Sequence, residues 1–351
     1  MPREHSLSIA LIGNPGCGLT TLFNQMTGGL QHSGRFSTEA HKTKEGPVRR
    51  HRGVNVIELP GIYSLSAYSI DDVATRDILL RGKPDVIVNV VDATSIERNL
   101  YLTLQLMELE LPMVLALNMM DEVRGNEIDI DIQKLSDRLT IPVIPISASK
   151  NEGIHDLIHY ALEAAANKTI PQKIDFCSGF VHTAIHTVAH LIDEDAKRAH
   201  LPLRFCCTKI VEGDEPIFSA LQLQAPELDI IAHLIDDMEH HLSTDREAAM
   251  ADMRYAFIGN LCSETIKKET PDTKEHLRSI RMDRVLTHKF FAIPIFLCIM
   301  LLVFYLTFSS VGAFLISYRS PAADVRRFPQ RKYTRIPAER REVRDCHENG
   351  W

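Results

Sequence analysis

The stretch GNPGCGLTT, residues 13–21, decides the fold of the first part of the chain. An apolar run precedes it and a helical pattern follows it, which is the order of strand, glycine-rich turn and helix in a phosphate-binding loop. In the usual pattern, G-x-x-x-x-G-K-[ST], backbone N–H groups surround the phosphates and the lysine ammonium reaches the outer ones. Gly13, Gly18 and Thr20 match this pattern, whereas Leu19 stands where the lysine should be. The stretch is therefore either a nucleotide-binding loop with a weakened hold on phosphate or an apolar turn.

Further apolar runs rich in valine and isoleucine follow this loop and alternate with helical patterns. The runs are VNVIELPG (54–61), PDVIVNVVDA (84–93), PMVLALNMMD (112–121) and PVIPISASK (142–150). Turn residues bound each run, and continuous apolar strands of this kind need helices on both faces of their sheet. The sequence therefore predicts an α/β domain over residues 1–168, with a mostly parallel sheet and flanking helices.

Two short motifs at the ends of later strands point to guanine. In NMMD, which ends at Asp121, the carboxylate can accept hydrogen bonds from guanine N1 and N2, which adenine cannot supply. Asn118 would brace the loops, while SASK would present the Ala148 N–H to the guanine oxygen and the Lys150 stem to the ring. The wrong base would leave buried polar groups unsatisfied, so such a site discriminates. Each motif alone is a common turn sequence, but their order after a phosphate loop makes them specific.

The motif ELPG, residues 58–61, follows another predicted strand. Guanine-nucleotide switches carry here an acidic residue that holds Mg²⁺ through water and a glycine whose N–H contacts the third phosphate. The order of the motifs is that of a P-loop GTPase, with GTP or GDP and Mg²⁺ as the expected cofactors. Thr20 and Glu58 are the candidate metal ligands. The candidate nucleotide-binding residues are Gly13, Asn14, Pro15, Gly16, Cys17, Gly18, Leu19, Thr20, Thr21, Glu58, Leu59, Pro60, Gly61, Asn118, Met119, Met120, Asp121, Ser147, Ala148, Ser149 and Lys150.

The rest of the chain divides into three predicted parts. Residues 169–285 show helical patterns and predict an all-α second domain. Residues 286–316 contain an uncharged apolar run, 291–316, that as a helix would measure roughly 39 Å, longer than the roughly 30 Å hydrocarbon core. A transmembrane helix is the favoured interpretation, and a buried soluble helix is the alternative. The basic, arginine-rich tail, 317–351, lacks apolar periodicity and is expected to be disordered.

Charge and cysteine content narrow the function classes. The chain carries a net charge of −7, and its acidic residues predominate ahead of the basic tail. Nucleic acid is therefore not the expected partner, because phosphate backbones need a basic footprint. The seven cysteines are scattered without a C-x-x-C pair, which favours a reducing, cytosolic environment. Basic residues flank the apolar run on both sides, so charge alone leaves its orientation undecided.

Several of these segments together resemble the ferrous iron transport protein B (FeoB) family. They are LIGNPGCGLTTLFNQMTG, ELPGIYSLSAYS, VVDATSIERNLYLTLQLMEL, ALNMMDE, RYAFIGNLC and DRVLTHKFFAIPIFLCIMLLVFYLTF, within residues 6–316. The resemblance implies a cytoplasmic guanine-nucleotide domain and a helical spacer, joined to a multi-helix membrane part in the bacterial inner membrane. It also implies Fe²⁺ as the transported ion, the lipid bilayer as a partner, and association with itself or with a full-length transporter of the family.

The chain departs from the family pattern mainly on the catalytic side. Relatives have lysine at Leu19, aspartate at Glu58, an asparagine linked to potassium-stimulated hydrolysis at Gly16, and a magnesium-binding threonine at Ala40. We therefore expect a weakened Mg²⁺ site and little or no GTP hydrolysis. The further membrane helices and cysteine-bearing gate motifs of the family do not follow Ile316, and the change there to an arginine-rich tail leads us to expect either truncation or a reading-frame change. One helix cannot enclose an ion path, because an ion in lipid needs a shell of polar groups.

Three interpretations of function stay open: a FeoB-type component of iron uptake, a membrane-anchored guanine-nucleotide module that does not hydrolyse, and a decayed transporter fragment. Two smaller features carry alternatives of their own. His182, His186 and His190 recur every four residues, a spacing for metal binding, but a solvated polar stripe is favoured. Cys17 could be a reactive thiol, although a small residue that fills the turn is the favoured interpretation.

Overall fold

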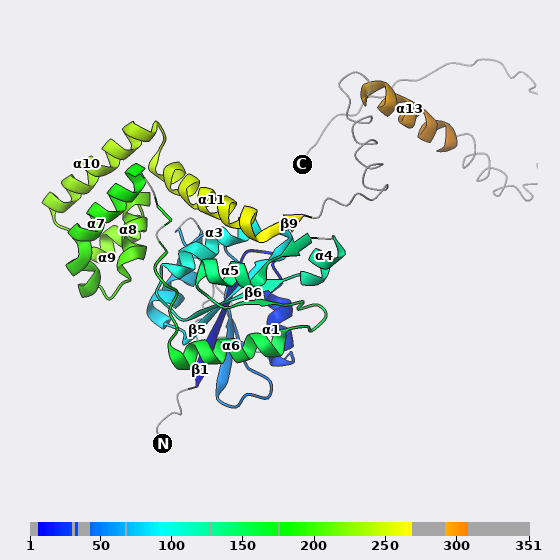
Figure 1. Cartoon of the computed structure of the whole chain (residues 1–351), viewed down its shortest axis with the longest axis horizontal. Coiled ribbons are helices and arrows are strands. Elements are labelled where there is room, and N and C mark those ends of the chain that lie inside the picture. The colour runs from blue at the N-terminus through cyan, green and yellow to red at the C-terminus, as the bar shows by residue number, and fades with distance from the viewer. Residues whose placement is uncertain are drawn as a thin grey trace, which may run out of the picture. The chain divides into compact units, whose positions relative to one another are not determined.

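The computed structural model in Figure 1 describes residues 6–29, 32–33, 43–66, 69–126, 128–174, 176–177, 179–268 and 292–307. Ala40, the end of the predicted membrane segment and the basic tail therefore lie outside the described residues. The chain divides into two compact units, Met1–Thr270 and Pro271–Trp351. All of the nucleotide-binding motifs belong to the first unit.

A seven-stranded sheet forms the centre of the first unit, in the order β2-β3-β4-β1-β5-β6-β8. Five strands are parallel: β1 (Leu7–Gly13), β4 (Val54–Glu58), β5 (Val86–Asp92), β6 (Met113–Asn118) and β8 (Val143–Pro145). β3 (Lys44–Pro47) and β2 (His32–Ser33) extend the sheet beyond β4 in antiparallel orientation. The predicted mostly parallel sheet is confirmed, while its antiparallel edge was not predicted.

Helices cover both faces of this sheet, because neighbouring strand residues point to opposite faces. Ile9 and Leu11 pack with α1 (Leu19–Thr27) and α6 (Ile154–Asn167) in one apolar cluster. Ala10 and Ile12 belong to a second cluster with α3 (Ile96–Met107) and α5 (Ile132–Leu139). Figure 1 shows these two layers of helices around the sheet. The remaining elements of this region are α2 (Ile70–Asp77), η1 (Ile78–Gly82), η2 (Ala93–Ser95) and α4 (Met120–Gly125).

Helices dominate the chain after α6. They are α7 (Gly179–Arg198), α8 (Leu203–Glu212), α9 (Glu215–Leu221), α10 (Ala225–Leu242) and α11 (Arg246–Thr265). Their apolar faces join the second cluster, so this helical region and the α3 face of the sheet share one core. The helical character expected here is confirmed, with one exception. After α11, β9 (Ile266–Lys268) pairs antiparallel with β7 (Ile128–Ile130) and links the end of the helical region back to the sheet domain.

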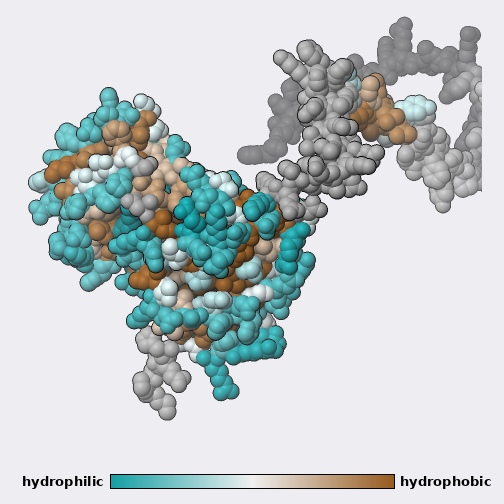
Figure 2. Space-filling view, viewed as in Figure 1, coloured by the Kyte–Doolittle hydropathy of each residue, from teal (hydrophilic) through white to brown (hydrophobic). Residues whose placement is uncertain are grey.

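The second unit contains one described helix, α13 (Ala292–Tyr305). Its large apolar side chains are exposed, from 49% for Ile299 to 69% for Ile293 and Leu301, and Figure 2 shows this hydrophobic surface. Within the parts of the chain that the structure describes, we find no helix whose length and apolar character together would let it cross a bilayer.

Candidate nucleotide-binding site

The phosphate-loop stretch forms a tight turn between β1 and α1. Gly18 has a φ of 94°, in the left-handed region, and a Cβ there would lie 2.4 Å from the Asn118 side chain. A Cβ on Gly13 would lie 2.3 Å from the Val90 carbonyl oxygen and 2.7 Å from Cys17 Sγ. Both positions therefore require glycine for space, and Gly18 also for its backbone conformation.

Cys17 lies buried inside this turn. Burial raises the pKa of its thiol to about 12, so the group stays protonated at neutral pH. A protonated, buried thiol is a poor nucleophile and a poor metal ligand. The structure favours the interpretation of Cys17 as a small residue that fills the turn.

The first turn of α1 is open to an anion, although its first side chain is apolar. Gly18, the N-cap residue of α1, has no side chain to cap the helix. The Leu19 N–H is taken by the Cys17 thiol, and the N–H groups of the next residues keep the capacity to bind phosphate. Leu19 is only 8% exposed and packs into the cluster between the sheet and α1. Thr20 and Thr21 are exposed at the same end. Leu19 thus supports the core at a position where the family pattern places a charge.

The ELPG motif lies directly beside the phosphate loop. Glu58, the last residue of β4, accepts a hydrogen bond from the Thr20 hydroxyl through Oε1. The Ile62 N–H donates to the Gly13 carbonyl at 3.1 Å, and a Cβ on Gly61 would approach the Pro15 backbone to 3.1 Å. The two candidate metal ligands therefore lie in contact, and little space separates the two loops.

Asn118 joins the phosphate loop to the SASK loop. Its Nδ2 donates to the Cys17 carbonyl at 2.8 Å, and its Oδ1 accepts from the Ala148 N–H at 3.0 Å. The side chain is 3% exposed, so both hydrogen bonds are buried. Loss of either partner would leave a buried polar group unsatisfied and so lower the stability of the fold. If a guanine oxygen accepted a hydrogen bond from the Ala148 N–H, it would share that N–H with Asn118 Oδ1 or replace Asn118 Oδ1 as the acceptor.

Asp121 lies at the edge of the same loops, with its side chain 16% exposed. A hydrogen bond from Ser147 lowers the pKa of its carboxyl group, and the Lys150 ammonium, 3.4 Å from Oδ2, acts in the same direction. The carboxylate is therefore ionised at neutral pH and can accept hydrogen bonds from a base. Lys150 is exposed, with its stem free to lie along a ring.

The structure brings the predicted residues together at the carboxyl ends of parallel strands, where open α/β sheets bind ligands. The phosphate loop follows β1, ELPG spans the end of β4, and NMMD and SASK follow β6 and β8. Not every predicted residue is available to a ligand. Among them, Leu59 and Met120 are buried in the α3-side core, whereas Pro15, Gly16 and Ser149 are exposed.

The motifs did not predict a group of buried charges between the sheet domain and the helical region. Arg254 of α11 is fully buried and pairs with Glu212 of α8, and its NH2 lies 3.7 Å from Oε1 of Glu108, just after α3. Lys209 Nζ, also fully buried, lies 2.6 Å from Glu212 Oε2 and donates to the Ser66 hydroxyl at 2.9 Å. Ser66 follows the ELPG segment, so this network ties that segment to the helical region.

Glu212 keeps its charge within this network, whereas burial raises the pKa of Glu108, the other carboxyl group near Arg254. Burial alone would raise the pKa of Glu212, but Arg254 and Lys209 together hold it below the usual value. Nearby, Arg76 of α2 pairs with Asp214 at 2.7 Å, with both side chains about 5% exposed or less. Residue types alone could not reveal these pairs, because their members lie far apart along the chain.

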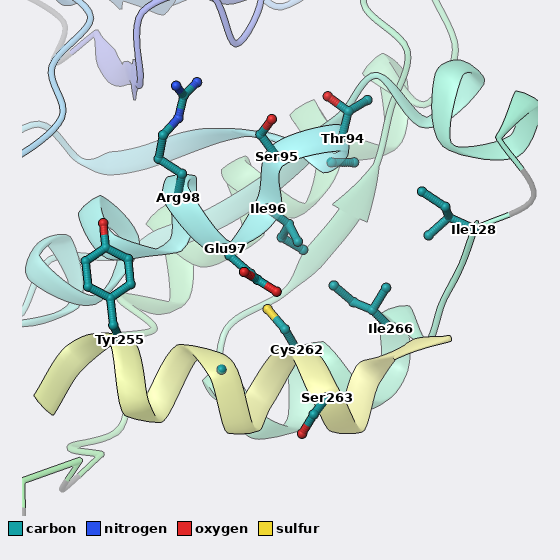
Figure 3. A pocket seen from close by; sticks show the side chains of 12 residues that line it. Thr94, Ser95, Ile96, Glu97, Arg98, Ile128, Tyr255, Cys262, Ser263 and Ile266 are labelled. Carbon is teal, nitrogen blue, oxygen red and sulfur yellow. The ribbon is translucent and has the colours of Figure 1, made fainter. Parts of the chain in front are cut away.

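A cavity of about 740 Å³ lies outside the nucleotide motifs, between the first turn of α3 and α11. Figure 3 shows Glu97 and Cys262 pointing toward one another across it, with Arg98 and Tyr255 beside them. The Arg98 carbonyl accepts a hydrogen bond from the phosphate-loop Asn14 at 3.5 Å, which is the nearest link to the nucleotide site. None of the residues that line this cavity belongs to the phosphate loop, ELPG, NMMD or SASK, so we place guanine recognition at the motif loops.

Two of the three histidines noted on α7 lie close together. The rings of His182 and His186 lie 4.1 Å apart between centroids, on a partly exposed helix face. Among the described residues, no group of three or more metal-binding side chains comes together.

Comparisons with known proteins agree with these motifs. Residues 7–161 match the family described as ferrous iron transport protein B, and residues 179–267 match the FeoB cytosolic helical domain. The chain is 34% identical over 318 residues to the Fe(2+) transport protein A/Fe(2+) transporter FeoB fusion protein of Porphyromonas gingivalis, covering 88% of this chain. It is equally 34% identical, over 316 residues, to the Fe(2+) transporter FeoB of Salmonella typhimurium, again covering 88% of this chain. The chain spans 37% of the length of the first of these curated relatives and 39% of the second.

A solved structure gives the same result for the first unit. A mutant of NFeoB from S. thermophilus bound to GDP superposes with a TM-score of 0.67 at 34% identity, covering 74% of this chain and all of that one. The two family matches lie in succession along the first unit, and the solved relative reproduces its sheet and helices. The chain belongs to the ferrous iron transport protein B (FeoB) family.

Proposed function

We propose that this chain is a FeoB-like component of a GTP-linked ferrous iron uptake system, and that it binds guanine nucleotide on the cytoplasmic side of the bacterial inner membrane. Three findings support the nucleotide part: the open N-terminus of α1, the ionised Asp121 and the bridging Asn118. The iron part is supported by the family, whose curated relatives are named as Fe²⁺ transporters.

The observation that carries the proposal is the Asn118 bridge. A side chain that holds two loops together through two buried hydrogen bonds fixes the base-reading loop against the phosphate loop. A site arranged in advance in this way recognises a base and a phosphate group at once, which is what a nucleoside diphosphate or triphosphate presents. Asp121 then selects guanine, because it accepts where guanine N1 and N2 donate.

Mg²⁺ fits the residues of this site poorly. Thr20 and Glu58 offer oxygen atoms, the ligand type that Mg²⁺ prefers, but they already bind one another. The Lys44 ammonium also lies 3.2 Å from Glu58 Oε2, and a fixed positive charge opposes a divalent ion. We propose that any Mg²⁺ is held weakly and that GTP hydrolysis is negligible, because phosphoryl transfer depends on positive charge near the phosphates.

The remaining parts of the proposal concern the membrane. We propose a guanine-nucleotide domain over residues 1–168, a helical spacer over 169–285, a membrane-spanning segment over 286–316 and a basic tail after it. The exposed apolar surface of α13 supports a bilayer as its surroundings, because such a surface is unfavourable in water. Self-association, or association with a full-length relative, would supply the further helices that an ion path needs.

The alternative is a membrane-anchored guanine-nucleotide-binding module, or a decayed fragment, that moves no iron. The poor fit of the site to Mg²⁺ favours a module that does not hydrolyse. An uptake assay with radioactive Fe²⁺, in a strain that lacks other ferrous transporters, tests the proposal. We expect no uptake above the empty vector from this chain alone and uptake when a full-length relative is co-expressed. If the chain also leaves that relative's uptake unchanged, the regulatory role fails as well.

A further inference from the structure

Lys44 lies beside the candidate phosphate site although it is far from the phosphate loop in sequence. It is the first residue of β3, and the antiparallel register of β3 and β4 places it directly opposite Glu58. Its Nζ lies 3.2 Å from Glu58 Oε2, with the lysine side chain 40% exposed and the glutamate side chain 11% exposed. The ammonium therefore reaches from the sheet edge to the end of β4, where the ELPG motif begins.

The Glu58 carboxylate connects this ammonium to the phosphate loop. One of its oxygens pairs with Lys44, and the other accepts the hydrogen bond from Thr20. Thr20 occupies the Ser/Thr position of the loop pattern, next to Leu19, where the lysine is missing. A single carboxylate thus separates a fixed positive charge from the position where phosphate oxygens are expected.

Electrostatics gives this arrangement a consequence for nucleotide binding. An unpaired Glu58 carboxylate beside the loop would repel a phosphate group, and Leu19 supplies no charge to compensate. In most P-loop proteins the loop lysine and Mg²⁺ provide that compensation. In the described part of this chain, the cation that contacts Glu58 is the Lys44 ammonium of β3. It lies where a Mg²⁺ ion would need to approach Glu58.

We propose that Lys44 supplies, from β3, the positive charge that Leu19 does not, so that guanine nucleotide binds this chain with little need for Mg²⁺. This inference rests on the proposed function, because it concerns the same nucleotide site. The ligand class is a guanosine diphosphate or triphosphate, and Lys44 would act on it by offsetting the negative charge of the Glu58 carboxylate that contacts Thr20. Glu58 then acts as the group that positions Lys44, rather than mainly as a metal ligand.

Calorimetric titration of the full chain in detergent with GDP tests this inference, once with Mg²⁺ and once with EDTA. We expect the affinity to change less than threefold between the two conditions. Lys44→Met should weaken binding roughly ten- to thirtyfold in EDTA, because the Glu58 carboxylate that contacts Thr20 would lose the positive charge that offsets it. Lys173→Met is the matched control, since Lys173 also pairs with a single carboxylate, Glu110, at 3.4 Å, but away from the motif loops. It should leave the affinity unchanged.

A rescue experiment separates a binding role from a structural one. In the double variant Leu19→Lys/Lys44→Met, a charge returns at the usual loop position, and GDP affinity should recover to near the wild-type value. Thermal melting without nucleotide should show all variants folded. The inference is overturned if Lys44→Met binds GDP as tightly as the wild type, or if EDTA abolishes wild-type binding. Absence of GDP binding under both conditions would overturn the proposed function along with it.

Discussion

Leu19→Lys is the substitution that best separates a working phosphate loop from an apolar turn. Leu19 is 8% exposed and lies at the first position of α1, beside Thr20. A lysine there can keep its methylene groups against the same apolar cluster while its ammonium extends toward solvent and ligand. The fold should therefore tolerate the change, provided that the ammonium stays in water or on the ligand.

The expected gain follows from the bond that the ammonium would make. A hydrogen bond to a charged group contributes about 1.5 to 3 kcal/mol, which corresponds to roughly a ten- to hundredfold gain in affinity for GTP. The existing charge of Lys44 should place the result near the lower end of that range. Turnover should stay close to zero, because Glu58 and Ala40 still differ from the family pattern; adding Glu58→Asp and Ala40→Thr should raise it.

Calorimetry with GTP, on the full chain in detergent, measures this effect. Gln133→Lys is the control, because it adds the same charge at an exposed position on α5, outside the motif loops. Its effect should stay within about threefold, as expected for a solvent-screened charge. If Leu19→Lys leaves GTP affinity unchanged or matches the control, the stretch does not act as a phosphate loop.

Three further predictions concern the parts that surround this loop. Arg254→Met should leave Glu212 and Glu108 buried without their partner and lower the free energy of unfolding by about 3 to 5 kcal/mol, as measured by thermal melting. The control Arg138→Met removes an exposed ion pair with Glu264 and should cost under about 1 kcal/mol. Asn118→Ala should weaken GDP binding at least tenfold in calorimetry, because the phosphate loop and the SASK loop lose the side chain that joins them. An unchanged affinity would show that this bridge is not needed for binding. Deletion of residues 291–316 should move the chain from the carbonate-washed membrane fraction to the supernatant, and a variant that still pellets would contradict the proposed anchor.

The regular parts of the fold could be predicted from the sequence because they depend on local patterns. Continuous apolar runs such as β5 and β6 indicate a parallel sheet, and the motifs lie at its carboxyl edge because parallel strands end on the same side. The antiparallel β3 could not be predicted, since KEGP contains no apolar alternation and reads as a turn. β9, with the sequence IKK, gives an equally weak signal.

Contacts between distant residues account for the rest of what the sequence did not reveal. Lys44 is an ordinary polar residue until the strand register places it opposite Glu58. Arg254, Lys209 and Glu212 have the spacing of exposed helix residues, and only the packing of α8 and α11 against α3 buries them. Charged residues are rarely buried without partners, but a single sequence does not say which partners meet.

Guanine selectivity is the central claim, and a paired titration with GDP and ADP tests it most directly. The full chain in detergent should bind GDP at least tenfold more tightly than ADP, because the Asp121 carboxylate accepts where guanine donates and adenine does not. Asp121→Asn should reduce that preference, since an amide presents a donor where guanine also donates, while leaving ADP affinity nearly unchanged. Equal affinities of the wild-type chain for GDP and ADP would contradict the account.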